Sequence, residues 1–185
     1  MNAIKFFIQG IKHFKEVGTI SRSSKFVSNT MTKDKYVDYK TARCIVELGA
    51  GDGPITEVLL KKMHPDAKLL CFEINDEFHE HLEAQFSHDP RITIIKDDAA
   101  KVGEYIKAAG FKEADAVLSE IPFVIIPSDE IIEQSHKYLK KGGYYVQLHY
   151  STVARKRYER IFGNSEIDFV TLNVPPAFIH VCQKK

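Results

Sequence analysis

Three glycines at alternate positions, Gly49, Gly51 and Gly53, follow a short apolar run within the stretch VELGAGDGPIT, residues 46–56. Glycine lets a backbone turn sharply and lets a ligand approach it closely, as in nucleotide-binding loops. Pro54, however, occupies the place of the third glycine in a dinucleotide G-x-G-x-x-G loop, and the carboxylates beside the glycines would repel a pyrophosphate. The loop therefore favours a positively charged ligand over a dinucleotide.

Acidic residues close two of the apolar runs that follow the loop. Glu73 lies twenty positions after Gly53, and Asp98 follows the next apolar run. A carboxylate at the end of a strand accepts hydrogen bonds from ribose hydroxyls, and Asp98 could accept one from an adenine amino group. S-adenosylmethionine combines an adenosine with a sulfonium and an amino group, so the loop and its acids together predict this cofactor. Each acid taken alone is more often a helix cap or a solvated loop residue.

Strand-like apolar runs alternate with helix-like patterns from residue 43 onward, and these elements must bring the glycines and acids together. Such an order is typical of a parallel, doubly wound sheet, which binds ligands at the carboxyl ends of its strands. Strands are expected at 43–48, 68–74, 91–96, 114–121 and 144–150. Helices are expected at 54–63, from a cap at Asn75 through Phe86, at 100–109, and from a cap at Ser128 to a stop at 140–143.

The end of the chain breaks this alternation. Strands are expected at 166–174 and 178–183, and only Pro175, Pro176 and Ala177 separate them. Because parallel neighbours need a much longer crossover, these two strands should be antiparallel. The sequence therefore predicts an α/β fold with a mainly parallel seven-stranded sheet and an antiparallel C-terminal hairpin.

The opening segment has a different pattern. Ile4, Phe7, Ile8, Ile11 and Phe14 fall on one helical face, while lysines lie toward other faces. Periodicity alone leaves two destinations for the apolar face, the protein's own sheet or a lipid surface, and favours the first. We expect an N-terminal amphipathic helix and helical cap in residues 1–40 and a cofactor-binding catalytic domain in residues 41–185.

Composition limits the classes of function. The chain has 185 residues, 44% of them hydrophobic, which suffices for one domain with a sizeable core. Its 26 Lys and Arg against 25 Asp and Glu give no overall attraction to nucleic acid. Cys44, Cys71 and Cys182 lack metal-ligand spacing, and no apolar run reaches the ~18 residues of a membrane span. We expect a cytoplasmic monomer without a metal site.

From residue 43 to the C-terminus, the sequence resembles the class I S-adenosylmethionine-dependent methyltransferases, which have a Rossmann-like fold. The resemblance rests on E-x-G-x-G-x-G at residues 47–53, on the acidic end of the second strand at Glu73, and on the pair Asp98-Ala99. It implies that Gly49, Gly51, Glu73 and Asp98 bind the cofactor. The full set of expected cofactor-binding residues is Glu47, Gly49, Ala50, Gly51, Gly53, Glu73, Ile74, Asp98, Ala99 and Ser119.

A closer resemblance is to the bacterial phospholipid N-methyltransferases, whose core is similar to that of the rRNA adenine dimethyltransferases. Four segments carry it, residues 17–24, 119–123, 147–150 and 173–177, with the sequences VGTISRSS, SEIPF, QLHY and NVPPA. It implies a peripheral enzyme at the inner membrane face that methylates the amine of phosphatidylethanolamine or a related aminolipid. It also implies that the N-terminal helix contacts an anionic membrane surface.

The segment SEIPF ends the fourth expected strand, where methyltransferases of amino nitrogen often carry Asp or Asn ahead of Pro-Tyr or Pro-Phe. Ser119 takes the place of the Asp or Asn here. By this resemblance, the expected catalytic residues are Ser119, Glu120, Pro122, Phe123 and Tyr150. Glu120 or Tyr150 would take or relay a proton of the acceptor amine, and Ser119 would hold the neutral amine. The rings of Phe123 and Tyr150 would stabilise the alkylammonium.

Departures from the family pattern leave the acceptor open. His149 stands where a small polar residue is expected, and residues 151–156 replace a proline-rich extension. An rRNA adenine methyltransferase is one alternative, served by the basic cluster of Arg155, Lys156, Arg157 and Arg160. That family carries an additional helical C-terminal domain, whereas this chain ends just after its last expected strand. A second alternative is a methyltransferase of a soluble amine. A third is a non-catalytic membrane-binding protein with the same fold, although the intact glycine loop argues against it.

Overall fold

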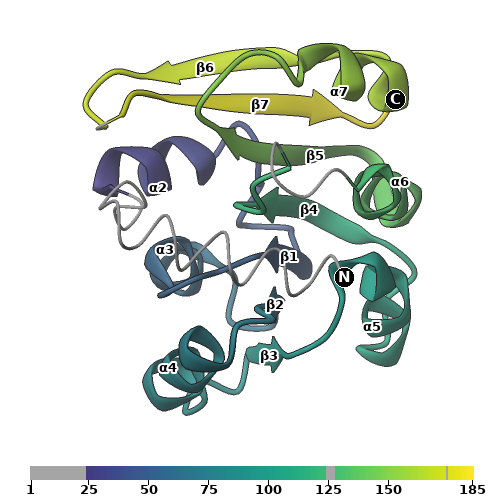
Figure 1. Cartoon of the computed structure of the whole chain (residues 1–185). Helices are drawn as coiled ribbons and strands as arrows, with labels where there is room; N and C mark the ends of the chain where they lie inside the picture. Colours follow the sequence, from purple (N-terminus) through teal and green to yellow (C-terminus); the bar gives the residue numbers. More distant parts are fainter. Residues whose placement is uncertain (1–23, 124–127, 174) are drawn as a thin grey trace, which may run out of the picture.

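A computed structural model describes residues 24–123, 128–173 and 175–185 of the chain (Figure 1). Its centre is a seven-stranded sheet in the order β3-β2-β1-β4-β5-β7-β6. The strands are β1 (Cys44–Leu48), β2 (Lys68–Phe72), β3 (Ile92–Ile95), β4 (Ala114–Ser119), β5 (Leu139–His149), β6 (Glu166–Val170) and β7 (Ala177–Gln183). The helices are α2 (Lys25–Met31), α3 (Pro54–Lys62), α4 (Asp76–Phe86), η1 (Ala99–Lys101), α5 (Val102–Ala108), α6 (Asp129–Tyr138) and α7 (Arg155–Phe162). The amphipathic helix expected near the N-terminus and the segment 17–23 lie outside the described residues.

The sheet has the mixed topology that the sequence predicts. Strands β1 to β5 pair in parallel, whereas β7 runs antiparallel to both β5 and β6. The predicted mainly parallel sheet with an antiparallel C-terminal hairpin is confirmed. In the register of the sheet, Ser119 of β4 lies beside Leu48 of β1 and Gln147 of β5. The carboxyl ends of these three strands are therefore level with one another.

Helices cover both faces of the sheet, α2, α3 and α4 on one and α5, α6 and α7 on the other (Figure 1). Each face has its own apolar cluster, one containing Ile55 of α3 and the other Ile132 of α6. Successive strand residues alternate between the two, so Ile45 belongs to the first cluster and Val46 to the second. None of the helices within the described ranges has the length and apolar character of a membrane span.

Residues 140–143, which the sequence predicts as a helix stop, belong instead to a strand. Helix α6 ends at Tyr138 and β5 begins at Leu139. Gly142 has a φ of +82°, and a Cβ on Gly143 would lie 2.7 Å from the carbonyl oxygen of Asp115. The two glycines therefore permit an irregular, close approach of β5 to β4. Strand β6 is also shorter than the predicted 166–174, because its pairing with β7 stops at Val170.

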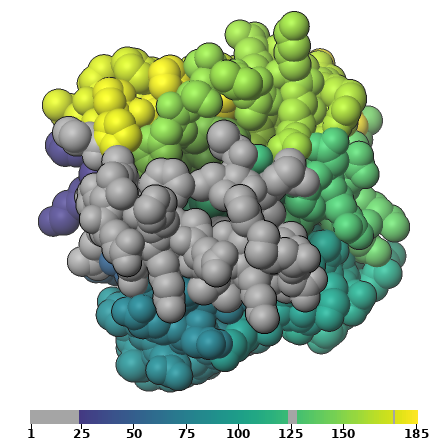
Figure 2. All heavy atoms as spheres, viewed as in Figure 1, coloured from purple at the N-terminus to yellow at the C-terminus, as the bar shows by residue number. Residues whose placement is uncertain are grey.

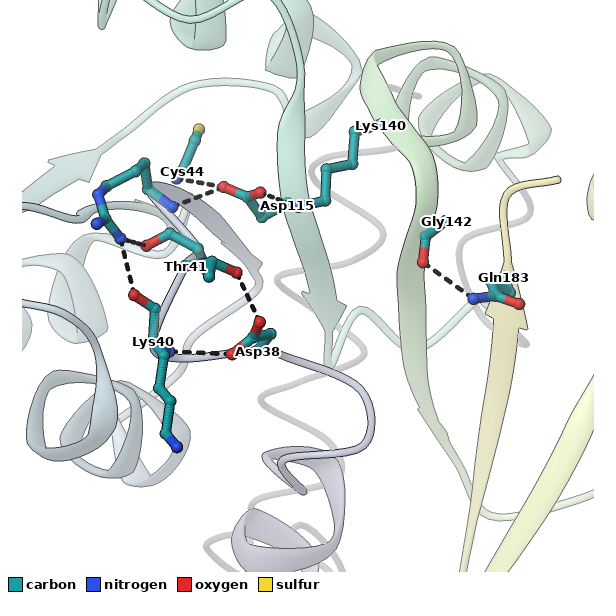
Figure 3. A network of polar contacts seen from close by, with 10 residues as sticks. Asp38, Lys40, Thr41, Cys44, Asp115, Lys140, Gly142 and Gln183 are labelled. Carbon is teal, nitrogen blue, oxygen red and sulfur yellow. Dashed lines mark hydrogen bonds and ion pairs between the residues drawn. The ribbon is translucent and has the colours of Figure 1, made fainter.

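Asp115 ties together the amino ends of β1, β4 and β5, at the opposite edge from the carboxyl ends (Figure 3). Its carboxylate accepts the backbone N–H of Arg43 at 2.7 Å and of Cys44 at 2.9 Å, and it pairs with the Lys140 ammonium. Burial raises the pKa of Asp115, but Lys140 and the two amides outweigh burial and lower the pKa overall. This ionised anchor fixes the starts of the three central strands.

Candidate active site

The glycine loop joins β1 to α3 and has a left-handed backbone at each glycine, with φ of 73° at Gly49, 58° at Gly51 and 85° at Gly53. Two of these glycines are also closely packed. A Cβ on Gly49 would lie 3.0 Å from the Ile121 side chain, and one on Gly53 would lie 2.6 Å from the Phe86 ring. No described atom lies within 4 Å of the corresponding position on Gly51. Gly51 therefore marks the part of the loop whose backbone is open to a ligand.

Glu73 follows β2 and braces the glycine loop. The side chain is buried; its Oε2 accepts the N–H of Gly51 at 2.8 Å, and its Oε1 accepts the N–H of Asn75 at 2.8 Å. Burial raises the pKa of Glu73, and the backbone hydrogen bonds limit the rise. Each carboxylate oxygen retains a second lone pair, so Glu73 can hold the loop and also accept ribose hydroxyls. Ile74, the next residue, is partly exposed beside it.

Glu47, near the end of β1, lies between the sheet and helix α3 and supports the glycine loop from the core. The side chain is fully buried, and its Oε2 accepts the Thr56 hydroxyl at 2.8 Å. Its Oε1 has no hydrogen-bond partner among the described residues. Burial raises the pKa of Glu47 to about 8, despite the hydrogen bond from Thr56. A cation bound at the loop would favour the ionised carboxylate, so the site and the charge of its ligand are coupled.

Asp98 and Ala99 follow β3, one strand beyond Glu73. Asp98 is exposed, and its carboxylate accepts the N–H of Ala100 at 2.9 Å, which caps η1. The neighbouring Asp97 is instead paired with Lys101 at 2.9 Å. Ala99 is buried at the base of this turn. The structure thus brings the carboxylate of Asp98 to the same edge as the glycine loop, as the sequence predicts for an adenine-binding residue.

The segment SEIPF follows β4 at the level of the loop. Ser119 is fully buried, and its hydroxyl accepts a backbone N–H two residues further on at 3.3 Å. The N–H of Glu120 donates to the last carbonyl of β1 at 2.9 Å, which anchors the turn. Phe123 is only 2% exposed and packs in the apolar cluster that α5 and α6 cover. Ser119 and Phe123 therefore face inward, while Glu120 and Pro122 are partly exposed.

Gln147 of β5 organises this segment and is not among the site residues expected from the sequence. Its buried Nε2 donates to the Ile121 carbonyl at 2.9 Å and to the Leu148 carbonyl at 3.0 Å, and its Oε1 accepts the Tyr145 hydroxyl at 2.7 Å. The Ile121 carbonyl also accepts the N–H of Phe123 at 2.9 Å, so both of its lone pairs are engaged. That carbonyl is therefore a fixed part of the turn rather than an acceptor for a substrate amine. The signal in the sequence is a glutamine inside the apolar run YYVQL, because a buried amide needs partners.

Tyr150, directly after β5, connects the segments QLHY, SEIPF and NVPPA. Its ring is 44% exposed. Burial raises the pKa of the Tyr150 hydroxyl, the Glu120 carboxylate raises it further, and a hydrogen bond with the Asn173 side chain offsets part of the rise. Glu120, Tyr150 and Asn173 come from three distant segments and meet at the carboxyl edge of β4 and β5.

The side chain of His149 lies on the face of the sheet that α7 covers and contacts that helix. Its Nε2 lies 2.6 Å from the Tyr158 hydroxyl, and its ring centroid lies 5.1 Å from that of His180. Burial lowers the pKa of His149 to about 4, so the imidazole is neutral at physiological pH. The unexpected histidine at this position therefore contributes to packing beneath α7.

The carboxyl edge of the sheet has two chemical halves. Over β1 to β3, the glycine loop with Glu47, Glu73 and Asp98 suits a cationic nucleoside cofactor. Over β4 and β5, Glu120 and Tyr150 suit a basic acceptor. Within the described ranges, no group of three or more His, Cys, Asp or Glu residues is arranged to hold a metal ion.

The methyltransferase domain family matches residues 45–143, a range that contains the glycine loop and the segment SEIPF. The ornithine lipid N-methyltransferase of Singulisphaera acidiphila is 27% identical over 183 residues, which cover 97% of this chain and 92% of that protein. The ribosomal RNA small subunit methyltransferase A of Thermotoga neapolitana is 27% identical over 116 residues, 63% of this chain but 40% of that protein. A solved 16S rRNA methyltransferase from T. thermophilus, in complex with AdoMet and guanosine, matches the fold with a TM-score of 0.67 at 15% identity, over 89% of this chain and 44% of that one.

Proposed function

Because this chain belongs to the methyltransferase domain family, we propose that it methylates the amine headgroup of a membrane aminolipid, of the phosphatidylethanolamine or ornithine-lipid kind. The chain is a class I methyltransferase that uses S-adenosylmethionine. One observation carries the choice of acceptor: the likeness to an ornithine lipid N-methyltransferase extends over 97% of this chain and 92% of that protein. The likeness to the rRNA enzyme stops at 40% of that enzyme's length.

The residues at the glycine loop fit S-adenosylmethionine. The open backbone at Gly51 would admit the methionine moiety, and the positive charge of a bound cofactor would favour the ionised form of the buried Glu47 carboxyl. Glu73 keeps lone pairs for the ribose hydroxyls, and the exposed Asp98 is available to the adenine amino group. When bound, the cofactor supplies a methyl group on a sulfonium, which the lone pair of an amine attacks in line.

The acceptor amine must be deprotonated before it attacks, because an aliphatic amine is protonated at neutral pH. Glu120, at the exposed part of the turn after β4, is the group that we assign to receive this proton. The raised pKa of Tyr150 keeps its hydroxyl protonated, so Tyr150 donates or relays a hydrogen bond and is not the resting base. Its exposed ring can also stabilise the alkylammonium product by about 1 kcal/mol. The buried Ser119 and Phe123 then support the turn from within.

In this proposal the enzyme is a monomer that binds peripherally to the inner face of the membrane. The amphipathic pattern of residues 4–14, which lie outside the described residues, supports contact of that segment with an anionic lipid surface. The lipid amine would then reach Glu120 and Tyr150 without leaving the bilayer interface.

A second acceptor, rRNA, is favoured by the likeness to the rRNA methyltransferase and by the basic residues Arg155, Lys156 and Arg160 of α7. Binding that depends on phosphate contacts weakens steeply with added salt. The formal net charge of the chain, +1, supplies little general attraction to RNA. Labelling of lipid in vesicles without labelling of rRNA under the same conditions would separate the two acceptors.

The deciding experiment is transfer of labelled methyl from S-adenosylmethionine to vesicles that contain phosphatidylethanolamine or an ornithine lipid. Parallel reactions contain rRNA or a soluble alkylamine in place of the vesicles. We expect label in the lipid headgroup, at a rate that falls when residues 1–16 are removed. Label found only in RNA or only in the soluble amine would exclude the lipid acceptor and leave methyl transfer intact. A Gly51→Val control, which closes the open backbone of the loop, should abolish labelling of every acceptor.

A further inference from the structure

The large hydrophobic side chains that stay exposed in the described residues come from only three parts of the fold. They are Phe26 (51% exposed), Tyr150 (44%), Val153 (86%), Phe169 (54%) and Leu172 (66%). Phe26 belongs to α2, Tyr150 and Val153 to the connection from β5 to α7, and Phe169 and Leu172 to the hairpin of β6 and β7. Apolar side chains that gather on one exposed surface are unfavourable in water, and such a patch usually marks a site that binds another protein or a membrane.

The register of the sheet sets the β5–α7 connection beside the hairpin. Phe178 of β7 pairs with His149, the last residue of β5, and also with Phe169 of β6. The rings of Phe169 and Phe178 lie 4.9 Å apart. The segment from β5 to Val153 and the segment from β6 to Leu172 therefore begin at the same height along the sheet. Val153 and Leu172 both lie beyond that height, at the carboxyl edge that carries the segment SEIPF and Tyr150.

Helix α2 joins this edge from the face of the sheet that carries α3. It packs against β5, β6 and β7, and Lys33, just after the helix, donates to Asp168 of β6 at 2.6 Å. Figure 1 shows α2 next to the turned end of the hairpin, and Figure 2 shows the hairpin and α7 along one rim of the molecule. Helix α2, whose first turn contains Phe26, thus lies on the same side of the molecule as the hairpin turn.

Two of these three segments carry cations, and none of the three carries an acid. Residues 24–30, 150–156 and 169–173 contain Lys25, Arg155 and Lys156 and no Asp or Glu. All three cations are exposed; Arg155 pairs with Glu159 within α7, whereas Lys25 and Lys156 have no ion-pair partner among the described residues. The other half of the edge, over β1 to β3, carries the acids of the cofactor site.

We infer that this surface, called the rim here and made of Phe26, Val153, Phe169 and Leu172 with Lys25, Arg155 and Lys156, docks on an anionic lipid bilayer. Exposed apolar side chains flanked by cations are what an interfacial surface needs, because the first enter the headgroup boundary and the second bind lipid phosphates. RNA or an acidic protein would engage the cations but leave Val153 and Leu172 in water. The inference rests on the proposed aminolipid function and adds a membrane contact beside Tyr150, separate from the N-terminal segment.

Cosedimentation of the full chain with vesicles tests the rim directly. The vesicles are phosphatidylcholine with or without phosphatidylglycerol, at low and at physiological salt. Arg155→Gln with Lys156→Gln should weaken binding to anionic vesicles roughly thirtyfold, since each cation near such a surface contributes about a fivefold gain. Val153→Asn with Leu172→Asn should weaken it on the order of tenfold with no change in net charge. A matched control, Lys112→Gln with Lys141→Gln, removes two exposed cations near the amino ends of β4 and β5 and should bind like the unmodified chain.

Methyl transfer by the same variants separates this inference from the proposed function. Transfer to an aminolipid in vesicles should fall with vesicle binding, while transfer to that lipid dispersed in detergent micelles should stay unchanged. Equal binding of all variants to vesicles would refute docking through the rim, even if the lipid is methylated. Loss of RNA binding instead of vesicle binding in the Arg155 and Lys156 variant would overturn it as well. Vesicle binding through the rim without methylation of any lipid would uphold the surface and refute the aminolipid acceptor.

Discussion

Replacing Glu47 by Gln should stabilise the protein, and the gain should grow with pH. The carboxyl is fully buried beneath the glycine loop, with Oε2 bound to Thr56 and Oε1 without a partner among the described residues. Its pKa is about 8 in the folded protein, against a reference value of 4.5. The unfolded chain therefore loses this proton near the reference value, whereas the folded chain keeps it to a much higher pH.

The sign and size of the effect follow from proton linkage. Between the two pKa values the folded state binds more protons than the unfolded state, so the free energy of unfolding falls as pH rises. The penalty is absent below the unfolded pKa and is complete above the folded pKa. At about 1.4 kcal/mol per pKa unit, burial of Glu47 costs roughly 3 kcal/mol near neutral pH and about 4 to 5 kcal/mol above pH ~8. Gln resembles the protonated carboxyl and can still accept the Thr56 hydroxyl, so the variant avoids this penalty.

Urea unfolding without cofactor measures the difference. At pH ~5 the Glu47→Gln variant and the unmodified protein should unfold at similar urea concentrations, whereas at pH ~8 the variant should need clearly more urea. Glu80→Gln, an exposed position on α4, is the matched control and should change the midpoint little at either pH. A gain of equal size at both pH values would refute the reasoning, because it would mean that Glu47 is already ionised in the folded protein.

Four further substitutions test the site. Gly53→Ala places a side chain on a left-handed backbone against the Phe86 ring and should lower the free energy of unfolding by about 2 to 3 kcal/mol. Gly51→Ala should lower the free energy of unfolding by only about 1 kcal/mol, but it should weaken the binding of cofactor measured by calorimetry. Gln147→Leu removes the amide that fixes the turn after β4, so kcat should fall while the Kd for S-adenosylmethionine stays unchanged. An equal loss of affinity for the cofactor would mean that the substitution disrupts the whole fold and not this turn alone. Tyr150→Phe keeps the ring but not the hydroxyl, and an unchanged kcat at every pH would remove its relay role.

The parts of the fold that depend on local chemistry could be predicted from the sequence. The caps at Asn75 and Ser128 accept backbone N–H groups at 3.2 Å and 3.4 Å and begin α4 and α6 as expected, because capping involves neighbours three residues away. The hairpin of β6 and β7 could be predicted for a similar reason: its connection is too short for any parallel arrangement. The glycine loop and its acids likewise follow from strand ends that a parallel sheet brings to one edge.

The misplaced elements depend on contacts between distant segments. Residues 140–143 look like a helix stop, but they form the irregular part of β5 between Leu139 and Tyr144, the two residues whose pairing with β4 flanks the shift in register. The inward orientation of Ser119 and Phe123 depends on how the turn after β4 packs on β5, which no local pattern encodes. The role of Gln147 could not be predicted from local sequence, because its amide donates to the carbonyl of Ile121, 26 residues earlier in the chain.

The division of the carboxyl edge into an acidic half and a basic, apolar half bears on turnover. A cofactor held by Glu73 and the glycine loop would lose its positive charge when its methyl group is transferred, and that charge would pass to the amine in the other half. The acidic half therefore attracts fresh cofactor more strongly than spent cofactor, and exchange between turnovers is favoured electrostatically. Dissolved salt screens that preference least where the carboxyls are buried, so relief from product inhibition should persist at ionic strengths that would detach the chain from the lipid surface proposed above.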